Sequence, residues 1–244
     1  MPTGKDTAQS RYEQSAGDWD GTFAADALNA YHVQACWRAF NRVAGPDLGG
    51  TTAVELGVGT GLFTDRLAPL FQRLIAVDFS AQMLEELRAK MARMNVGNVE
   101  YLCARAEALE PVAPGSVDAV LCFGLIENIA ALDPLFREVR RILKPGGRFA
   151  GVASNAACPW YPLRARLAGD KWYWRDVHLR TSQQLRDAAL AADLRPGALR
   201  GWGLIPSQLP NSALLAPLAG LERILEVTPL RSWMGGLAFR FEAP

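Results

Sequence analysis

The feature that most constrains the fold is a glycine-rich turn at residues 57–61. Its glycines alternate in the pattern G-x-G-x-G, directly after an apolar, β-branched run at 51–54. The residues that follow, 62–70, place leucine and phenylalanine at helical spacing. Glycine permits positive φ angles and lets the backbone approach a ligand without a Cβ in the way. The sequence therefore predicts a strand-turn-helix unit that holds a nucleotide-like ligand.

Two acidic residues lie at fixed offsets from this turn. Glu55 precedes it, and Asp78 ends the next predicted strand. An acid roughly 20 residues after such a turn lies where a ribose diol is bound, and a carboxylate accepts two hydroxyl hydrogen bonds. The alternative is that both acids only cap strand ends. The dinucleotide-binding pattern requires glycine at position 62, where this chain has leucine, which disfavours a nicotinamide-dependent oxidoreductase.

Four further blocks make the sequence resemble the class I S-adenosylmethionine (SAM) dependent methyltransferases. They read D-F-S-A-Q-M-L at 78–84, A-R-A-E-A-L at 104–109, S-V-D-A-V-L-C at 116–122 and L-K-P-G-G-R-F at 143–149. The corresponding blocks of that family are D-x-S-x-x-M-L, G-D-A-E-x-L, S-F-D-x-V and L-K-P-G-G-x-F. The resemblance is close over residues 50–155 and loose elsewhere, and it implies SAM as the cofactor.

The resemblance also implies a set of cofactor contacts. The acid at 78 would hold the ribose, the residues after it would flank the adenine, and the block at 104–109 would line the adenine edge. The residues expected to contact SAM are Tyr12, Glu55, Gly57, Val58, Gly59, Gly61, Asp78, Phe79, Met83, Arg105, Ala106, Glu107 and Phe123. Arg105 stands where the family commonly has aspartate, so an acceptor for the adenine amino group is lost, which Glu107 replaces in part.

Strand and helix patterns alternate along most of the chain. Strands are expected at 52–56, 73–78, 98–103, 117–123, 147–154, 197–203 and 236–241, and helices at 8–20, 23–43, 61–70, 80–94, 131–142 and 182–190. Such alternation is typical of a doubly wound α/β fold. The resemblance implies a seven-stranded, mostly parallel, Rossmann-like sheet in the order 3-2-1-4-5-7-6. We expect one domain over 1–244, with a helical cover at 1–45 and acceptor-side additions at 155–232.

The C-terminal part of the chain is rich in aromatic residues. Five of the seven tryptophans come after residue 155, at positions 160, 172, 174, 202 and 233. They indicate either a core for the additions or an apolar acceptor pocket. We expect the pocket to be formed by the N-terminal helices and residues 159–179, facing Phe123 and Leu125. Leucines at 214, 218, 221 and 225 form a helical stripe, which would serve as a lid, a dimer face or packing.

Three residues are candidates for a general base. Methyl transfer from a sulfonium is an in-line displacement, so most of the work is positioning, and a base is needed only where the acceptor arrives protonated. The candidates are His178 before the helix at 182–190, Glu127 after the strand at 117–123, and His32 in an N-terminal helix. Each of them is also compatible with a purely structural role.

The segment at 122–129 bears on the acceptor. It reads C-F-G-L-I-E-N-I and is similar to the C-x-E-x-L-E-H-V of the ubiquinone-pathway O-methyltransferases, but Gly124 and Asn128 replace a carboxylate and a histidine. Because two metal-binding or proton-handling groups are lost, we expect no catalytic metal. The segment is not N-P-P-Y or D-P-P-Y either, which disfavours the amino groups of bases or glutamine as acceptors.

Composition narrows the class of protein further. The chain has 244 residues of which 50% are hydrophobic, which excludes disorder, and its formal net charge of +1 gives no general attraction to nucleic acid. The polar residues 1–6 and the prolines that break later apolar stretches predict a cytoplasmic protein without a membrane span. The four cysteines lack C-x-x-C spacing and only two histidines are present, which disfavours a structural zinc site.

The favoured function is transfer of a methyl group from SAM to a small aromatic or amphipathic molecule, at oxygen rather than nitrogen or carbon. The alternative is a methyltransferase-like protein that binds the cofactor without turnover, which Arg105, Gly124 and Asn128 make conceivable. A nicotinamide-dependent oxidoreductase ranks third, because the Tyr-x-x-x-Lys pair is missing near the fourth strand. The sequence is compatible with a homodimer.

Overall fold

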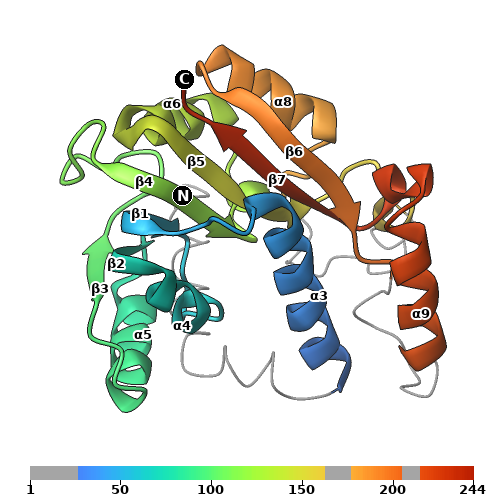
Figure 1. Ribbon diagram of the computed structural model, residues 1–244, viewed down its shortest axis with the longest axis horizontal. Helices are drawn as coiled ribbons and strands as arrows, with labels where there is room; N and C mark the ends of the chain where they lie inside the picture. Colours follow the sequence, from blue (N-terminus) through green and yellow to red (C-terminus); the bar gives the residue numbers. More distant parts are fainter. Residues whose placement is uncertain (1–26, 163–176, 205–214) are drawn as a thin grey trace, which may run out of the picture.

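A seven-stranded sheet organises the part of the chain that the computed structural model describes, residues 27–162, 177–204 and 215–244 (Figure 1). Its strands are β1 (Gly50–Leu56), β2 (Phe71–Asp78), β3 (Val99–Cys103), β4 (Val117–Phe123), β5 (Leu143–Ser154), β6 (Arg195–Trp202) and β7 (Gly236–Glu242). They lie in the order β3-β2-β1-β4-β5-β7-β6. The predicted fold class and strand order are confirmed.

The first five strands of the sheet are parallel, and β7 pairs antiparallel with both β5 and β6. Parallel strands need crossover helices, which cover both faces. The described helices are α3 (Ala27–Ala44), α4 (Thr64–Leu67), α5 (Ala81–Arg93), α6 (Leu132–Ile142), α8 (Ser182–Ala191) and α9 (Leu215–Leu225), with short 3-10 helices η2 (Ala68–Leu70), η3 (Ile126–Asn128) and η6 (Pro229–Trp233). None of these helices is long and apolar enough to cross a membrane.

Successive residues of the central strands point to opposite faces and are buried on both. In β1, Ala53 packs in a cluster with Phe40 and Val43 of α3, whereas Val54 packs in a second cluster with Phe136 of α6. Both β1 residues have no exposed surface. The alternation is the period of a strand, and burial of both sets explains why β1 has apolar residues at the consecutive positions 53 and 54.

Several predicted boundaries move in the structure. The helix predicted at 61–70 is reduced to α4 and η2, because Gly61 has a φ of +80° and belongs to the turn. The strand predicted at 147–154 already begins at Leu143. The helix from 182 is confirmed, with Thr181 as its N-cap. The side chain of Thr181 accepts a hydrogen bond from the backbone amide of Gln184. The helix predicted at 8–20 lies outside the described residues.

Candidate active site

A cleft of about 480 Å³ opens at the carboxyl ends of β1, β2, β4 and β5. The strand order reverses between β1 and β4, and ligands of doubly wound sheets bind at such a point. The residues that line it are Asn29, His32, Val33, Cys36, Glu55, Gly57, Val58, Gly59, Leu62, Phe63, Asp78, Phe79, Met83, Phe123, Gly124, Leu125, Glu127, Asn128, Val152, Ala153, Ser154, Cys158, Trp160, Tyr161, Trp202, Gly203, Leu204, Gly235 and Gly236.

The glycine turn is hydrogen-bonded to the end of β2. The amides of Gly57 and Val58 donate to the carbonyl of Val77 over 2.8 and 3.1 Å. The amide of Gly59 donates to Oδ2 of Asp78 over 2.9 Å. The conformation of the turn is therefore set by the neighbouring strand before any ligand binds.

Two of the turn positions accept only glycine. Gly57 has a φ of +65°, and a Cβ there would lie 2.9 Å from Cδ1 of Leu125. Gly61 has a φ of +80°, and a Cβ there would lie 2.2 Å from Cδ1 of Leu87. Positive φ and close packing both exclude a side chain. The backbone at Gly57 thus stays open to the cleft, which fits a cradle for a nucleoside.

Asp78 lies at the floor of this cradle and is 6% exposed. Its Oδ1 accepts a hydrogen bond from the amide of Ser80 over 2.9 Å. Burial raises the pKa of Asp78, although the amides of Ser80, Gly59 and Phe79 act in the opposite direction. A carboxylate has about four lone-pair sites, so both oxygens keep capacity for further donors such as ribose hydroxyls.

Glu55, the second acid of the cradle, is 3% exposed. Its Oε2 accepts a hydrogen bond from Oγ1 of Thr64 over 2.7 Å. Burial raises the pKa of Glu55 to about 8, and the Thr64 bond offsets only part of this effect. The carboxyl is therefore largely protonated at neutral pH, and a cation bound beside it would draw its pKa down.

An aromatic cluster forms one wall of the cleft. Phe123 stacks on Phe63 with ring centroids 4.3 Å apart and meets Phe40 at 4.8 Å. Trp37 stacks against both phenylalanines, with ring centroids 6.0 Å from Phe63 and 6.4 Å from Phe123. Aromatic faces attract cations, so this wall suits a sulfonium.

Glu127 adds a carboxylate to the lining of the cleft. Its Oε1 accepts a hydrogen bond from Oγ of Ser154 over 2.9 Å. Its Oε2 is buried and has no hydrogen-bond partner among the described residues. Burial raises the pKa of Glu127. The hydrogen bonds that its carboxylate accepts act in the opposite direction and offset only part of this effect. A buried oxygen without a partner is costly, and a ligand that donates a hydrogen bond would remove that cost.

Eight of the thirteen predicted cofactor residues line the cleft, namely Glu55, Gly57, Val58, Gly59, Asp78, Phe79, Met83 and Phe123. The block after β3 lies beside the cradle, because the Ala104 amide donates to the Asp78 carbonyl over 3.0 Å. In that block Arg105 and Glu107 form an ion pair of 3.2 Å, and Ala106 is 7% exposed. Gly61 belongs to the turn, and Tyr12 lies outside the described residues.

The three candidate bases differ in position. Glu127 and His32 line the cleft. His178 is exposed, and its backbone amide donates to the Glu127 carbonyl over 2.7 Å. From the predicted acceptor segment 159–179, Trp160 and Tyr161 line the cleft, whereas residues 163–176 lie outside the described chain.

The sequence reasoning missed the contribution of β5 and of the turns beside β6 and β7. Ser154 ends β5, next to β4 in the sheet. Asn155 follows it, fully buried, and its side-chain amide donates to the carbonyls of Ser232 and Met234 over 2.9 and 2.8 Å. The signal for Ser154 was present, because β5 is parallel to β4 and its carboxyl end must reach the same edge.

A second, smaller hollow of about 220 Å³ lies at the amino ends of β4 and β5. Its charged residues pair with one another, as Lys144 does with Asp118 at 2.6 Å. We assign it no ligand.

Comparisons with known proteins agree with the geometry of the cleft. Residues 54–151 match the family model described as "Methyltransferase domain". The chain is 34% identical over 135 residues to the ubiquinone/menaquinone biosynthesis C-methyltransferase UbiE of Rubrivivax gelatinosus, covering 54% of this chain and 51% of that protein. It is 30% identical over 161 residues to the demethylmenaquinone methyltransferase of Lactococcus lactis, covering 64% and 62%. The matches thus span about half to three fifths of these relatives.

Solved structures share the fold. A SAM-dependent methyltransferase from Thermotoga maritima superposes with a TM-score of 0.70 at 18% identity, over 97% of this chain and 99% of the other. The geranyl diphosphate C-methyltransferase of Streptomyces coelicolor, solved with Mg²⁺, geranyl diphosphate and S-adenosyl-L-homocysteine, gives 0.60 at 16% identity, over 93% and 84%. Residues 54–151 thus carry a methyltransferase domain, and the cradle and strand order of the chain are similar to those of the class I SAM-dependent methyltransferases.

Proposed function

We propose that the protein transfers the methyl group of SAM to a small aromatic or amphipathic molecule held beside Glu127. The observation that carries this proposal is the unpartnered Oε2 of Glu127, which lies in the same cleft as Asp78 and the glycine turn. The cleft thus holds both a cradle for a nucleoside and a buried carboxylate oxygen that has no partner among the described residues. Such a combination suits a cofactor and an acceptor bound together.

On the cofactor side, Asp78 would hold the ribose hydroxyls, and the backbone at Gly57 and Gly59 would lie against the amino-acid part. Phe79 and Met83 line the cleft after Asp78 and would flank the adenine. Arg105, Ala106 and Glu107 would meet the adenine edge. When bound, SAM supplies a methyl group on a cationic sulfur, and the stacked faces of Phe63 and Phe123 would stabilise that charge.

On the acceptor side, Glu127 would act as the general base. Its Oε2 accepts the proton of an acceptor hydroxyl while the hydroxyl oxygen forms the new bond to the methyl carbon, and the electron pair of the broken bond stays on sulfur. Ser154 orients the carboxylate through Oε1. The raised pKa of Glu127 makes it a stronger base than an exposed carboxylate.

Oxygen is the atom that we propose to be methylated. Carbon is the second candidate, because the Rubrivivax relative is named a C-methyltransferase. Removal of a phenol proton makes the ring carbon next to the oxygen nucleophilic as well, so the same base would serve either atom. Position alone then decides which atom lies in line with the methyl group.

The test is methyl transfer from radiolabelled SAM to a panel of hydroxylated aromatic and amphipathic molecules. Glu127→Gln keeps the shape of the side chain, and we expect it to lower kcat by about 100-fold or more with SAM affinity nearly unchanged. His178→Ala is the matched comparison, because its imidazole is exposed, and His32→Ala tests the remaining candidate. Magnetic resonance of the product distinguishes a methoxy group from a ring methyl.

Two results would redirect the proposal. A loss in His178→Ala equal to that expected of Glu127→Gln would make His178 the base. Tight binding of S-adenosylhomocysteine without transfer to any acceptor would support the cofactor-binding protein without turnover.

A further inference from the structure

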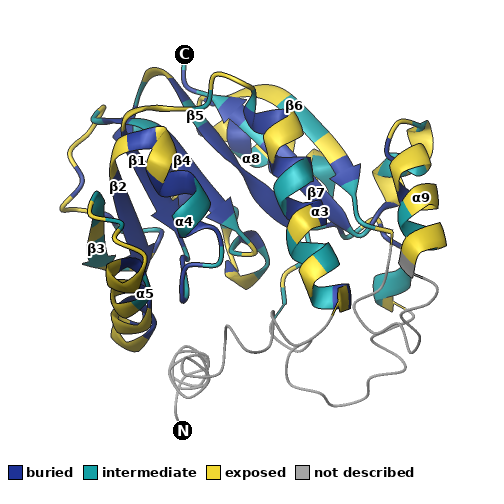
Figure 2. Ribbon diagram, turned by 60° about the horizontal axis from the view of Figure 1, so that its bottom comes forward, coloured by how far each residue is buried: buried dark blue, intermediate teal, exposed yellow. Residues whose placement is uncertain are grey.

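Helix α9 and the turn that follows it at 226–227 point acidic side chains toward the protein and apolar side chains toward solvent. Glu222 and Glu226 are 0% and 4% exposed, whereas Leu221, Ile224 and Val227 are 45%, 63% and 71% exposed. Figure 2 shows α9 at the edge of the molecule with much of its surface exposed. The usual amphipathic arrangement of a surface helix is the opposite.

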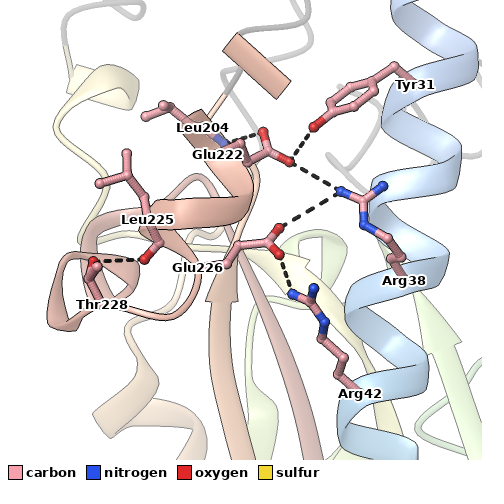
Figure 3. A network of polar contacts seen from close by, with 8 residues as sticks. All are labelled: Tyr31, Arg38, Arg42, Leu204, Glu222, Leu225, Glu226 and Thr228. Carbon is pink, nitrogen blue, oxygen red and sulfur yellow. Dashed lines mark hydrogen bonds and ion pairs between the residues drawn. The ribbon is translucent and has the colours of Figure 1, made fainter. Parts of the chain in front are cut away.

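The contacts with α3 explain this orientation (Figure 3). The hydroxyl of Tyr31 donates to Oε1 of Glu222 over 2.7 Å. Arg38 lies 3.6 Å from Glu222 and 4.0 Å from Glu226, and Arg42 pairs with Glu226 as well. Rolling α9 to bury its apolar side would separate both buried carboxylates from these partners, which is strongly unfavourable.

The exposed apolar surface continues beyond the helix. In η6, Leu230 is 51% and Trp233 is 62% exposed. With Leu221, Ile224 and Val227 these residues form what we call the α9 outer face. Single exposed apolar residues are common on proteins, but a cluster of five large ones within thirteen residues marks a surface that meets a partner.

The charges beside the α9 outer face indicate which partner. Residues 215–233 contain four charged side chains, of which Glu222 and Glu226 point to α3. The other two are Arg223 and Arg231, for which the described residues provide no ion pair. The face is therefore apolar and cationic. A two-fold dimer through it would bring like charges together, whereas an anionic bilayer surface would complement them.

We propose that the α9 outer face docks the protein on anionic lipid surfaces. With eleven residues α9 is too short to span a bilayer and would lie along it, its apolar side chains among the acyl chains. Trp233 has the amphipathic ring that favours the headgroup level, and the two arginines would meet lipid phosphates.

The helix that carries the α9 outer face borders the cleft through its opposite side, which faces α3. The amide of Leu204 donates to Oε2 of Glu222 over 2.8 Å, and Leu204 lines the cleft while remaining 39% exposed. The docking proposal goes beyond methyl transfer and does not depend on it, because lipid binding is measured without an acceptor.

The experiment is co-sedimentation of the full chain with vesicles of phosphatidylcholine alone or mixed with phosphatidylglycerol. We expect binding to the mixed vesicles that weakens as salt is raised. The double variant Ile224→Ser/Val227→Ser should bind the mixed vesicles more weakly by at least about tenfold, since both substitutions remove apolar groups that would enter the bilayer. Leu190→Ser, at a 59% exposed leucine on α8, is the matched control and should bind as the parent does.

A second variant tests the electrostatic part. Arg223→Gln/Arg231→Gln should remove most of the preference for phosphatidylglycerol, and each arginine is expected to account for about fivefold. Binding of S-adenosylhomocysteine reports that every variant is folded.

Three outcomes would overturn the proposal. They are absence of binding to mixed vesicles, equal loss in Leu190→Ser and in the double variant, and a dimer in analytical ultracentrifugation that Ile224→Ser/Val227→Ser dissociates. The last outcome would assign the α9 outer face to a second copy of the chain.

Discussion

The amide of Gly59 donates a 2.9 Å hydrogen bond to Oδ2 of Asp78. The glycine turn after β1 and the acid that ends β2 are thereby one hydrogen-bonded unit, to which the amides of Gly57 and Val58 add two bonds to Val77. Asp78 consequently has two tasks, because it fixes the turn and offers its remaining acceptor capacity to a ligand.

Asp78→Ala should weaken binding of S-adenosylhomocysteine by about 100-fold, because two ribose hydroxyls lose a charged acceptor and the Gly59 amide loses its partner. Titration calorimetry measures the change. Asp133→Ala on α6 is the control, since its carboxylate is exposed and pairs with Arg137 on the same helix. Tight binding of NAD by the parent protein without heat from S-adenosylhomocysteine would contradict the assignment of the cradle.

Glu55 should make the protein less stable as pH rises. The folded pKa of about 8 lies above the usual 4.5, so the folded chain binds the Glu55 proton more tightly than the unfolded chain does. The stability that the protonated Glu55 carboxyl gives to the folded state is fully present below about pH 4.5 and is lost as the pH rises through about 8. Denaturant unfolding over this range should show the parent losing about 4–5 kcal/mol at most relative to Glu55→Gln. Parallel pH profiles of the two proteins would exclude the effect.

Gly57→Ala and Gly115→Ala should differ although both glycines have positive φ, +65° and +60°. Nothing lies within 4 Å of a Cβ at Gly115, whereas Leu125 lies 2.9 Å from one at Gly57. Both variants lose about 1 kcal/mol from backbone strain, and Gly57→Ala loses more because its Cβ must displace Leu125. Only Gly57→Ala should in addition weaken S-adenosylhomocysteine binding by more than about tenfold. Equal affinities in calorimetry would show that the turn does not touch the cofactor.

Tyr31→Phe should destabilise the protein by about 1–3 kcal/mol, because it removes a hydrogen bond to the buried Glu222 carboxylate. Burial, followed by the neighbouring Glu222, raises the pKa of Tyr31 to about 12, so the hydroxyl stays a donor at physiological pH. Urea unfolding compares Tyr31→Phe with Tyr101→Phe. The Arg88 guanidinium lies 4.8 Å from the centroid of the Tyr101 ring, and this contact is kept when phenylalanine replaces tyrosine. A loss no larger than in Tyr101→Phe would mean that the network does not hold α9.

Much of the fold and the cradle could be predicted because their signals are local. Gly57, Glu55 and Asp78 lie within one strand-turn-helix-strand unit, and their spacing carries the geometry. The pairing of Glu127 with Ser154 could not be read in this way, since it depends on the register of β4 against β5. The exposed position of His178 likewise depends on how its backbone meets Glu127.

The leucine stripe near the C-terminus shows the limit of periodicity. Leu221 was one of its members, and the structure leaves that side chain 45% exposed. Hydrophobic spacing predicts which residues share a helix face, but not which face is buried. Here Arg38 and Arg42, in a helix far away in the sequence, select the acidic face.

The place of β7 has a consequence for how the chain is assembled during synthesis. β7 lies between β5 and β6, and among the described strands it alone pairs with β6, from Arg195 opposite Glu242 to Trp202 opposite Gly236. A ribosome delivers β7 after all the other strands. The cradle between β1 and β2 can therefore form on the nascent chain, whereas β6 waits without a partner until residues 236–242 have emerged. The strands that carry the cradle are thus complete before the strand that closes this edge of the sheet has been synthesised.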